Sequence, residues 1–175
     1  EIIDRDEEEK TRDIARSETT VTCSAMDLDF DNEDILATGN VAMHQPDRLL
    51  TAGTAIYTGA SKSWEVYGNV IVQDEGDYYE APSFTYNEDT GEIVAPQGAF
   101  FEIKPDEDQQ RDFADWFRKR DGDDFNEAEF KELKIFVRGD QMVFDDESDI
   151  LIITGNADVR YKDVSLNSDK ATIYL

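Results

Sequence analysis

The sequence predicts an all-β fold: an antiparallel β-jellyroll, or open β-trough, built from two-strand repeats of about 29 residues with one short helical insertion. A pattern of β-forming residues recurs at a constant offset, since Leu50 lies 29 residues after Val21 in equivalent positions. Clusters of Gly, Asn, Asp and Ser separate the recurring segments. Regularly spaced strands bounded by turn residues are typical of all-β proteins.

The repeat is clearest between Leu50 and Val70. Leu50, Ala52, Ala55 and Tyr57 stand in one segment, and Gly68-Asn69-Val70 begins eleven residues after Tyr57. Looser copies begin at Val21, Tyr79 and Val137, and a half copy begins at Leu166. Each copy predicts a first strand like residues 49–58 and a second like residues 64–73, joined by turns such as 59–63 and 74–77. Because these connections are short, we expect sequential strands to be antiparallel neighbours in a meander.

The Gly-Asn pairs fall in the middle of the predicted strands, where a glycine marks a bend, a bulge or a close backbone approach. If every strand bends there, the meander folds into two facing sheets with one apolar row inside. The predicted row is Val21, Cys23, Met26, Leu28, Val41, Met43, Leu50, Ala52, Ala55, Tyr57, Val66, Val70, Val72, Ala81, Phe84, Tyr86, Phe100, Val137, Met142, Phe144, Ile153, Ala157, Val159, Leu166, Ala171 and Ile173. The pattern leaves two interpretations open: the core of a closed sandwich, or the lining of a lipid-sized trough.

Two segments lie outside the repeat. Residues 1–19 predict a charged N-terminal arm, and residues 20–175 a single domain interrupted by an insertion at 105–132. Within the insertion, Phe113, Trp116 and Phe117 have the i, i+3, i+4 spacing of a helical apolar face, and a second short helix is predicted from Asn126. This face either packs on the end of the sandwich or binds a partner.

Charge and composition exclude several classes of function. Lys and Arg number 17 against 42 Asp and Glu, which gives a net charge of −25. Such a chain is repelled by nucleic-acid phosphates and by bare anionic membranes. The stacked acidic turns predict at most a weak association with calcium or magnesium. A single cysteine, Cys23, and a single histidine, His44, exclude an internal disulfide and metal centres built from several such residues.

The sequence predicts neither an enzyme nor a bound cofactor. It contains no Gly-rich phosphate loop, nucleophile elbow or zinc-ligand spacing. Residues 121–130 look like a calcium loop, but aligning Asp121 and Asp123 as ligands puts Phe130 where the bidentate glutamate belongs.

The repeat resembles the OstA-like domain of lipopolysaccharide transport, the family of LptA, LptC and the N-terminal domain of LptD. The resemblance is carried by Leu50, Ala52, Ala55, Tyr57 and Val66, followed by Gly68-Asn69-Val70, and covers residues 20–104 and 133–175. The third copy departs from it, with Gly98-Ala99-Phe100 in place of Gly-Asn-Val.

This resemblance implies a periplasmic protein whose apolar trough carries the acyl chains of lipopolysaccharide between the inner and outer membranes. The residues expected to bind lipid are Leu28, Val41, Leu50, Ala52, Ala55, Tyr57, Val70, Phe84, Tyr86, Met142, Phe144 and Val159. Other lipopolysaccharide-transport proteins are expected to join head to tail through open strand edges, with Ile173, Phe113, Trp116 and Phe117 as the partner-binding residues. The acidic charge conflicts with the phosphates of the ligand, so magnesium bridges, an outward placement of the carboxylates and a different lipid all stay open. The alternative function is a non-lipid structural or protein-interaction β-sandwich that assembles through the same edges.

Overall fold

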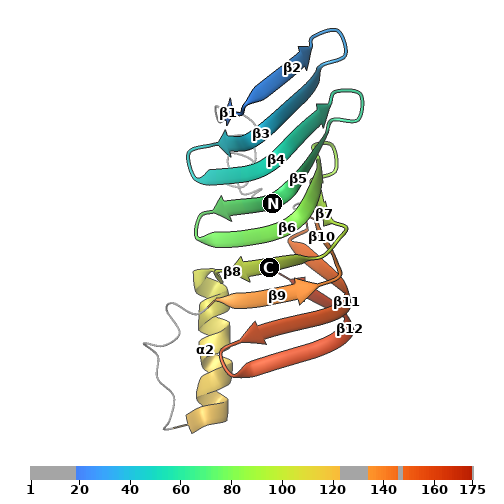
Figure 1. Cartoon of the computed structure of the whole chain (residues 1–175). Helices are drawn as coiled ribbons and strands as arrows, with labels where there is room; N and C mark the ends of the chain where they lie inside the picture. The colour runs from blue at the N-terminus through green and yellow to red at the C-terminus, as the bar shows by residue number, and fades with distance from the viewer. Residues whose placement is uncertain (1–18, 123–133, 146–147, 175) are drawn as a thin grey trace, which may run out of the picture.

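The strands form one antiparallel sheet, shown by a computed structural model that describes residues 19–122, 134–145 and 148–174 (Figure 1). The sheet contains twelve strands in these residues. Their bounds are β1 Thr20–Thr22, β2 Ala25–Asp29, β3 Asp34–His44, β4 Arg48–Thr58, β5 Ser63–Asp74, β6 Asp77–Asn87, β7 Glu92–Ala95, β8 Ala99–Ile103, β9 Ile135–Gly139, β10 Gln141–Asp145, β11 Ile150–Tyr161 and β12 Val164–Tyr174.

The pairing follows the order of the chain, so the predicted antiparallel meander is confirmed. β3, β4, β5 and β6 pair in succession, and β11 pairs with β12. In three places, two short strands take the position of one long strand. β1 and β2 both pair with β3, β7 and β8 both pair with β6, and β10 and β9 both pair with β11.

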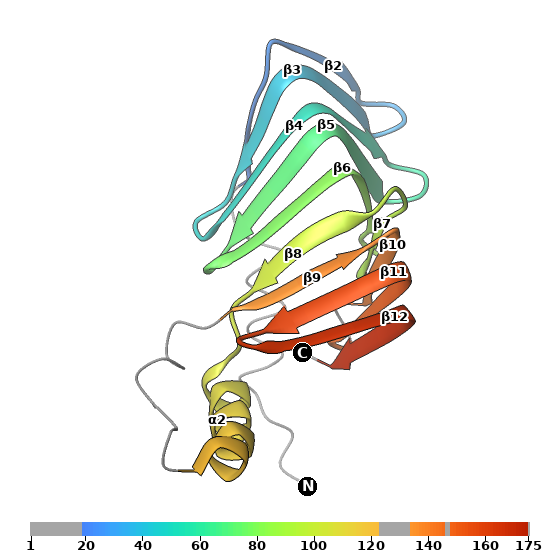
Figure 2. The ribbon, with the colours of Figure 1, turned by 60° about the horizontal axis from the view of Figure 1, so that its bottom comes forward.

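The long strands bend in the middle, where the sequence placed the Gly-Asn pairs. Both residues of each pair have positive φ, at 75° and 50° for Gly39-Asn40, 89° and 54° for Gly68-Asn69, and 73° and 48° for Gly155-Asn156. The pairing register shifts at each of these sites. Figure 2 shows strands β3 to β6 folding over into two arms, with β4 and β6 following the bends of the strands they pair with.

The third copy breaks instead of bending. Only Gly98 has positive φ there, at 83°, and the strand stops at Ala95 and resumes at Ala99 as β8. The interrupted stretch is Pro96-Gln97-Gly98, where Pro96 has no backbone N–H to donate to the ladder. The departure of Gly98-Ala99-Phe100 from the repeat pattern therefore has a visible structural consequence.

Neighbouring strands approach closely at the bends, and this requires glycine. A Cβ atom added to Gly68 would lie 3.1 Å from the Cα of Gly53 on the adjacent strand. A Cβ atom added to Gly53 would meet the same neighbour from the other side, 3.3 Å from the Tyr67 carbonyl oxygen. The two backbones are therefore in contact here, and a side chain at either glycine would push the strands apart.

We expect Gly68→Ala to lower the free energy of unfolding by about 2 kcal/mol, because it adds both a positive-φ penalty and a backbone contact. Urea unfolding followed by circular dichroism measures the change. The matched control is Asn69→Gly at the same bend, where glycine adopts the observed φ freely and the change should stay under about 1 kcal/mol. Equal losses in the two variants would contradict the assigned role of Gly68.

The insertion contains helix α2, Glu107–Asp121, beyond the ends of β8 and β9. Asp106 caps its start, because its carboxylate accepts from the Gln109 backbone N–H at 2.7 Å while the Gln109 side chain accepts from the Asp106 N–H at 3.1 Å. The second helix predicted from Asn126 lies outside the described residues. No helix in the part of the chain that the structure describes is long and apolar enough to cross a membrane.

Candidate functional site

Two continuous apolar rows cross the inner face of the bent sheet, one on each arm. Row 1 follows the printed strand pairings through Leu28, Ile35, Tyr57, Trp64, Tyr86, Ile93, Phe144, Leu151 and Ile173. Row 2 follows them through Val21, Met43, Leu50, Val72, Tyr79, Phe101, Val137, Val159 and Leu166. With neighbouring strands about 4.8 Å apart, each row of nine side chains is about 38 Å long.

Smaller side chains fill the space between the rows, next to the bend. Val41 pairs with Ala52 and Val70 with Ala81, and all four are buried. Ala37, Ala55 and Val66 form a similar buried line on the other side of the bend. Because short side chains bring the arms together, the two rows belong to a single interior. Among the described residues this interior contains no buried charged residue.

The structure brings the predicted lipid-binding residues together on this face. Val41, Ala52, Ala55, Val70, Phe84 and Met142 are buried. Leu50, Tyr57, Tyr86, Phe144 and Val159 are half-buried, and Leu28 is exposed. Whether they bind lipid stays a prediction.

The rows become accessible at the two ends of the sheet. At one end Met26 and Leu28 on β2 are each 43% exposed, and at the other Leu166 on β12 is 51% exposed. Both strands lie at the edge of the sheet within the described residues. The interior therefore continues to both open edges as an apolar surface.

One inward assignment was wrong, because Phe100 lies on the outer face. Its ring is 6.2 Å from Phe136 in a stacked arrangement and 6.3 Å from Tyr78, with the Arg138 guanidinium 4.9 Å above it. Phe101 takes the inner position, 5% exposed and in register with Tyr79 and Val137. The inner positions continue in unbroken alternation from Ile93 and Ala95 to Ala99 and Phe101, but Gly98 is offset by one residue from the glycine of the other copies. Aligning Gly98 with those glycines therefore selected the wrong one of two consecutive phenylalanines.

Other inner residues were missing from the predicted row although a signal for them exists. Leu151 lies two positions before Ile153, and alternation alone places both on the same face. Ile103, Ile135 and Tyr161 continue the alternation of β8, β9 and β11 to the strand ends, where they are in register with one another. They lie at strand ends, where the repeat pattern gives way to the insertion or to a turn.

An aromatic rim lies in row 1. The rings of Tyr57 and Trp64 are 4.9 Å apart, and both side chains donate a hydrogen bond of 3.2 Å to the Glu88 carboxylate. Desolvation, followed by the charge of Glu88, raises the pKa of Tyr57. The rings present apolar faces beside polar tips, an arrangement that suits a boundary between apolar and aqueous surroundings.

Helix α2 covers the end of the interior at β11. The Phe113 ring lies 4.6 Å and the Phe117 ring 5.7 Å from the ring of Tyr161. Phe117 is only 1% exposed, whereas Trp116 is 52% exposed. The predicted apolar face is therefore divided, with Phe113 and Phe117 toward the sheet and Trp116 toward solvent.

Ionic contacts hold the last turn of α2 against the β11–β12 turn. Arg120 donates to Asp163 at 2.9 Å and to Asp121 at 2.6 Å, and its guanidinium lies 4.4 Å from the Phe117 ring. The hydrogen bond from Arg120, followed by its charge, lowers the pKa of Asp121. These groups are partly exposed, so burial of Phe117 dominates the attachment of the helix.

We expect Phe117→Ala to lower the free energy of unfolding by about 3 kcal/mol, because it removes a fully buried ring between the helix and the sheet. Trp116→Ala, one position away and half-exposed, should cost less than about 1 kcal/mol. Urea unfolding of both variants under one buffer gives the comparison. A larger loss in Trp116→Ala would mean that the helix packs through its other side.

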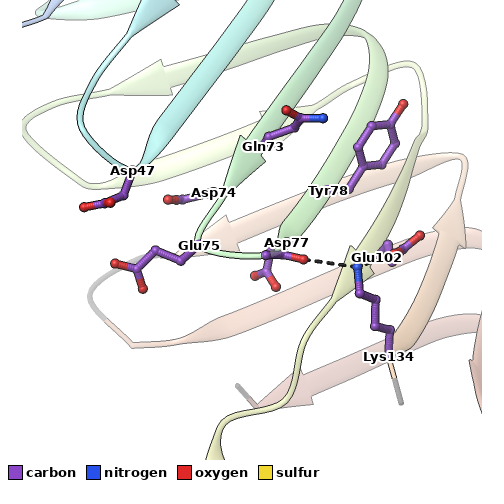
Figure 3. A pocket seen from close by; sticks show the side chains of 9 residues that line it. Asp47, Gln73, Asp74, Glu75, Asp77, Tyr78, Glu102 and Lys134 are labelled. Atoms are coloured by element: carbon purple, nitrogen blue, oxygen red, sulfur yellow. Dashed lines mark hydrogen bonds and ion pairs between the residues drawn. The ribbon is translucent and has the colours of Figure 1, made fainter. Parts of the chain in front are cut away.

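An acidic hollow of about 550 Å³ opens at the β5–β6 turn, beside the end of β8 and the start of β9 (Figure 3). It is lined by Asp47, Gln73, Asp74, Glu75, Gly76, Asp77, Tyr78, Glu102 and Lys134. Lys134 pairs with Glu102 at 2.5 Å, and Asp77 accepts from the Lys104 backbone N–H at 2.7 Å. No group of three or more potential metal ligands is found among the described residues. Weak calcium or magnesium association thus stays a prediction.

The fold and site define a class of protein: an antiparallel meander of bent strands wrapped around an apolar interior, which confirms the predicted jellyroll fold class. No family model matches the chain, and no curated protein matches it. Among solved structures it is similar to LptH of Pseudomonas aeruginosa, described as the LptA-homologous periplasmic component of the lipopolysaccharide transport device. That match has a TM-score of 0.40 and 11% identity, and covers 90% of this chain and 76% of LptH.

Proposed function

We propose that the chain binds lipid acyl chains between its two arms and serves in lipopolysaccharide transport in the periplasm. The observation that carries this proposal is the pair of uninterrupted apolar rows that reach exposed residues at both sheet edges. Each CH₂ group transferred from water into such an interior contributes about 0.8 kcal/mol. Several acyl chains can therefore be held without any specific polar contact.

The placement of charge supports the same proposal. Among the described residues the carboxylates lie on turns and outer positions, such as Glu80 and Asp158, and none is buried in the interior. Acyl chains inside would meet no charged group, while the phosphates of a lipopolysaccharide headgroup would meet an acidic exterior. A divalent cation between phosphate and carboxylate would relieve this repulsion.

Open strand edges support the proposed assembly with other transport proteins. Residues 164–170 of β12 are exposed without interruption, and Tyr174 is 76% exposed. An exposed edge strand is a template for a further strand from another chain. The same edge also suits the alternative function, a protein-interaction module that binds no lipid.

Lipid titration separates the two functions. A fluorescent lipid A probe is titrated into the folded protein with and without magnesium, and unlabelled lipopolysaccharide is used as competitor. Saturable and competable binding that strengthens with magnesium is expected. Its absence in both buffers, from protein shown by circular dichroism to be folded, would remove the lipid proposal and leave the edge-binding module.

We expect Ala55→Asp to abolish probe binding, because it places a charge at a fully buried position between the rows. Ala60→Asp on the exposed β4–β5 turn carries the same change in charge and should bind like the wild type. Leu28→Asp, at the exposed end of row 1, serves if Ala55→Asp fails to fold, and it should weaken binding severalfold. Unchanged binding in a folded Ala55→Asp or in Leu28→Asp would place the ligand elsewhere.

A further inference from the structure

Tyr161 places a hydroxyl group in apolar surroundings. Its side chain is only 7% exposed, and its Oη has no hydrogen-bond partner. It is the one buried side-chain polar atom in this condition among the described residues. An unpaired buried hydroxyl destabilises the folded protein, and phenylalanine would fill the same space without that cost.

Tyr161 lies at the end of the apolar inner face, and this position indicates which group of a ligand its hydroxyl would contact. It is the last residue of β11, in register with Ile135 at the start of β9, which pairs with Ile103 at the end of β8. The apolar inner face therefore ends at this line of residues. In a lipid the apolar chain likewise ends at a carbonyl group, which accepts hydrogen bonds and donates none.

We propose that Tyr161 is the polar anchor of the lipid site, donating a hydrogen bond from its Oη to the carbonyl oxygen of an acyl ester at the end of the interior. This inference rests on the proposed lipid-binding function and adds to it the ligand group that is recognised and its location. A few placed polar groups in an otherwise apolar pocket are what fix the position of a ligand. A tyrosine hydroxyl is protonated at neutral pH and can donate, and burial raises the pKa of Tyr161 further.

Helix α2 is the cover of this anchor. Phe113 and Phe117 pack on the Tyr161 ring, and partly exposed ion pairs of Arg120 with Asp121 and Asp163 add to the attachment of the last helical turn. An acyl group that reaches Tyr161 displaces these rings in part. Trp116, next to Phe117, reports such a displacement by its fluorescence.

The test compares two neutral ligands that differ in one carbonyl group, methyl laurate and dodecyl methyl ether, by displacement of the uncharged probe N-phenyl-1-naphthylamine. The wild type should bind the ester about 3- to 10-fold more tightly than the ether, the range of one hydrogen bond. Tyr161→Phe should lose this preference and bind the two ligands about equally. Tyr79→Phe is the matched control, because Tyr79 lies on the same face but its hydroxyl already donates to Asp77 at 2.7 Å. It should keep the preference for the ester.

Thermal unfolding provides a second readout, the change in melting temperature of Tyr161→Phe. If the hydroxyl had a purely structural role, this change would have the opposite sign. Without ligand, Tyr161→Phe should melt at the same temperature as the wild type or about 2–4 °C higher, and Tyr79→Phe should melt lower. Displacement by both ligands without preference, or a preference that survives in Tyr161→Phe, would overturn the anchor and leave the lipid function intact. A lower melting temperature of Tyr161→Phe would show that the hydroxyl has a structural partner and would also overturn it. Displacement by neither ligand would remove the lipid function itself.

Discussion

The left-handed backbone pair in the middle of the long strands is the constraint on which the rest of the structure depends. A flat meander of this sequence would hold two apolar rows in one plane, exposed to water along its whole width. Bending β3, β5 and β11 at Gly39-Asn40, Gly68-Asn69 and Gly155-Asn156, together with the strands paired to them, turns one face into an interior. Asparagine tolerates positive φ better than most side chains, and glycine alone tolerates the contact between neighbouring backbones. The rows, the open edges and the covered end at Tyr161 all follow from this local geometry.

The acidic charge is compatible with the fold because the interior excludes it. Alternation in a strand sends successive side chains to opposite faces, so a carboxylate costs little when it takes an outer position beside an inner valine or alanine. The remaining carboxylates lie in the turns, where they accept hydrogen bonds from nearby backbone N–H groups. Asp29, for example, accepts from the N–H groups of Asp31 and Asn32. The hydrogen bond from the Asn32 side chain, with those from the backbone, lowers the pKa of Asp29, so this arrangement weakens only in strong acid.

Much of this architecture could be predicted from the sequence because it repeats. Four approximate copies, three of them with Gly-Asn at one phase, indicate the strand number, the order and the bend, and alternation indicates most of the inner face. What escaped prediction lies where the period fails. Phe100 and Phe101 follow the broken third bend, and Tyr161 also contacts a helix whose packing side depends on tertiary contacts. Phe113, Trp116 and Phe117 share a helical face by spacing, but only the position of the sheet decides which of them is buried.

The order of pairing has a consequence for how such a protein changes length. Each strand of the meander contacts chiefly the strands next to it in the chain, as in solenoid proteins, whose stability is close to a sum of repeat and interface contributions. Inserting or deleting one two-strand unit would therefore extend or shorten the interior by about 10 Å while leaving the other contacts in place. The bend travels with each unit, because it is encoded by two adjacent residues and not by a distant contact. Evolution can in this way adjust the capacity of the interior by gene-internal duplication, without redesigning a core.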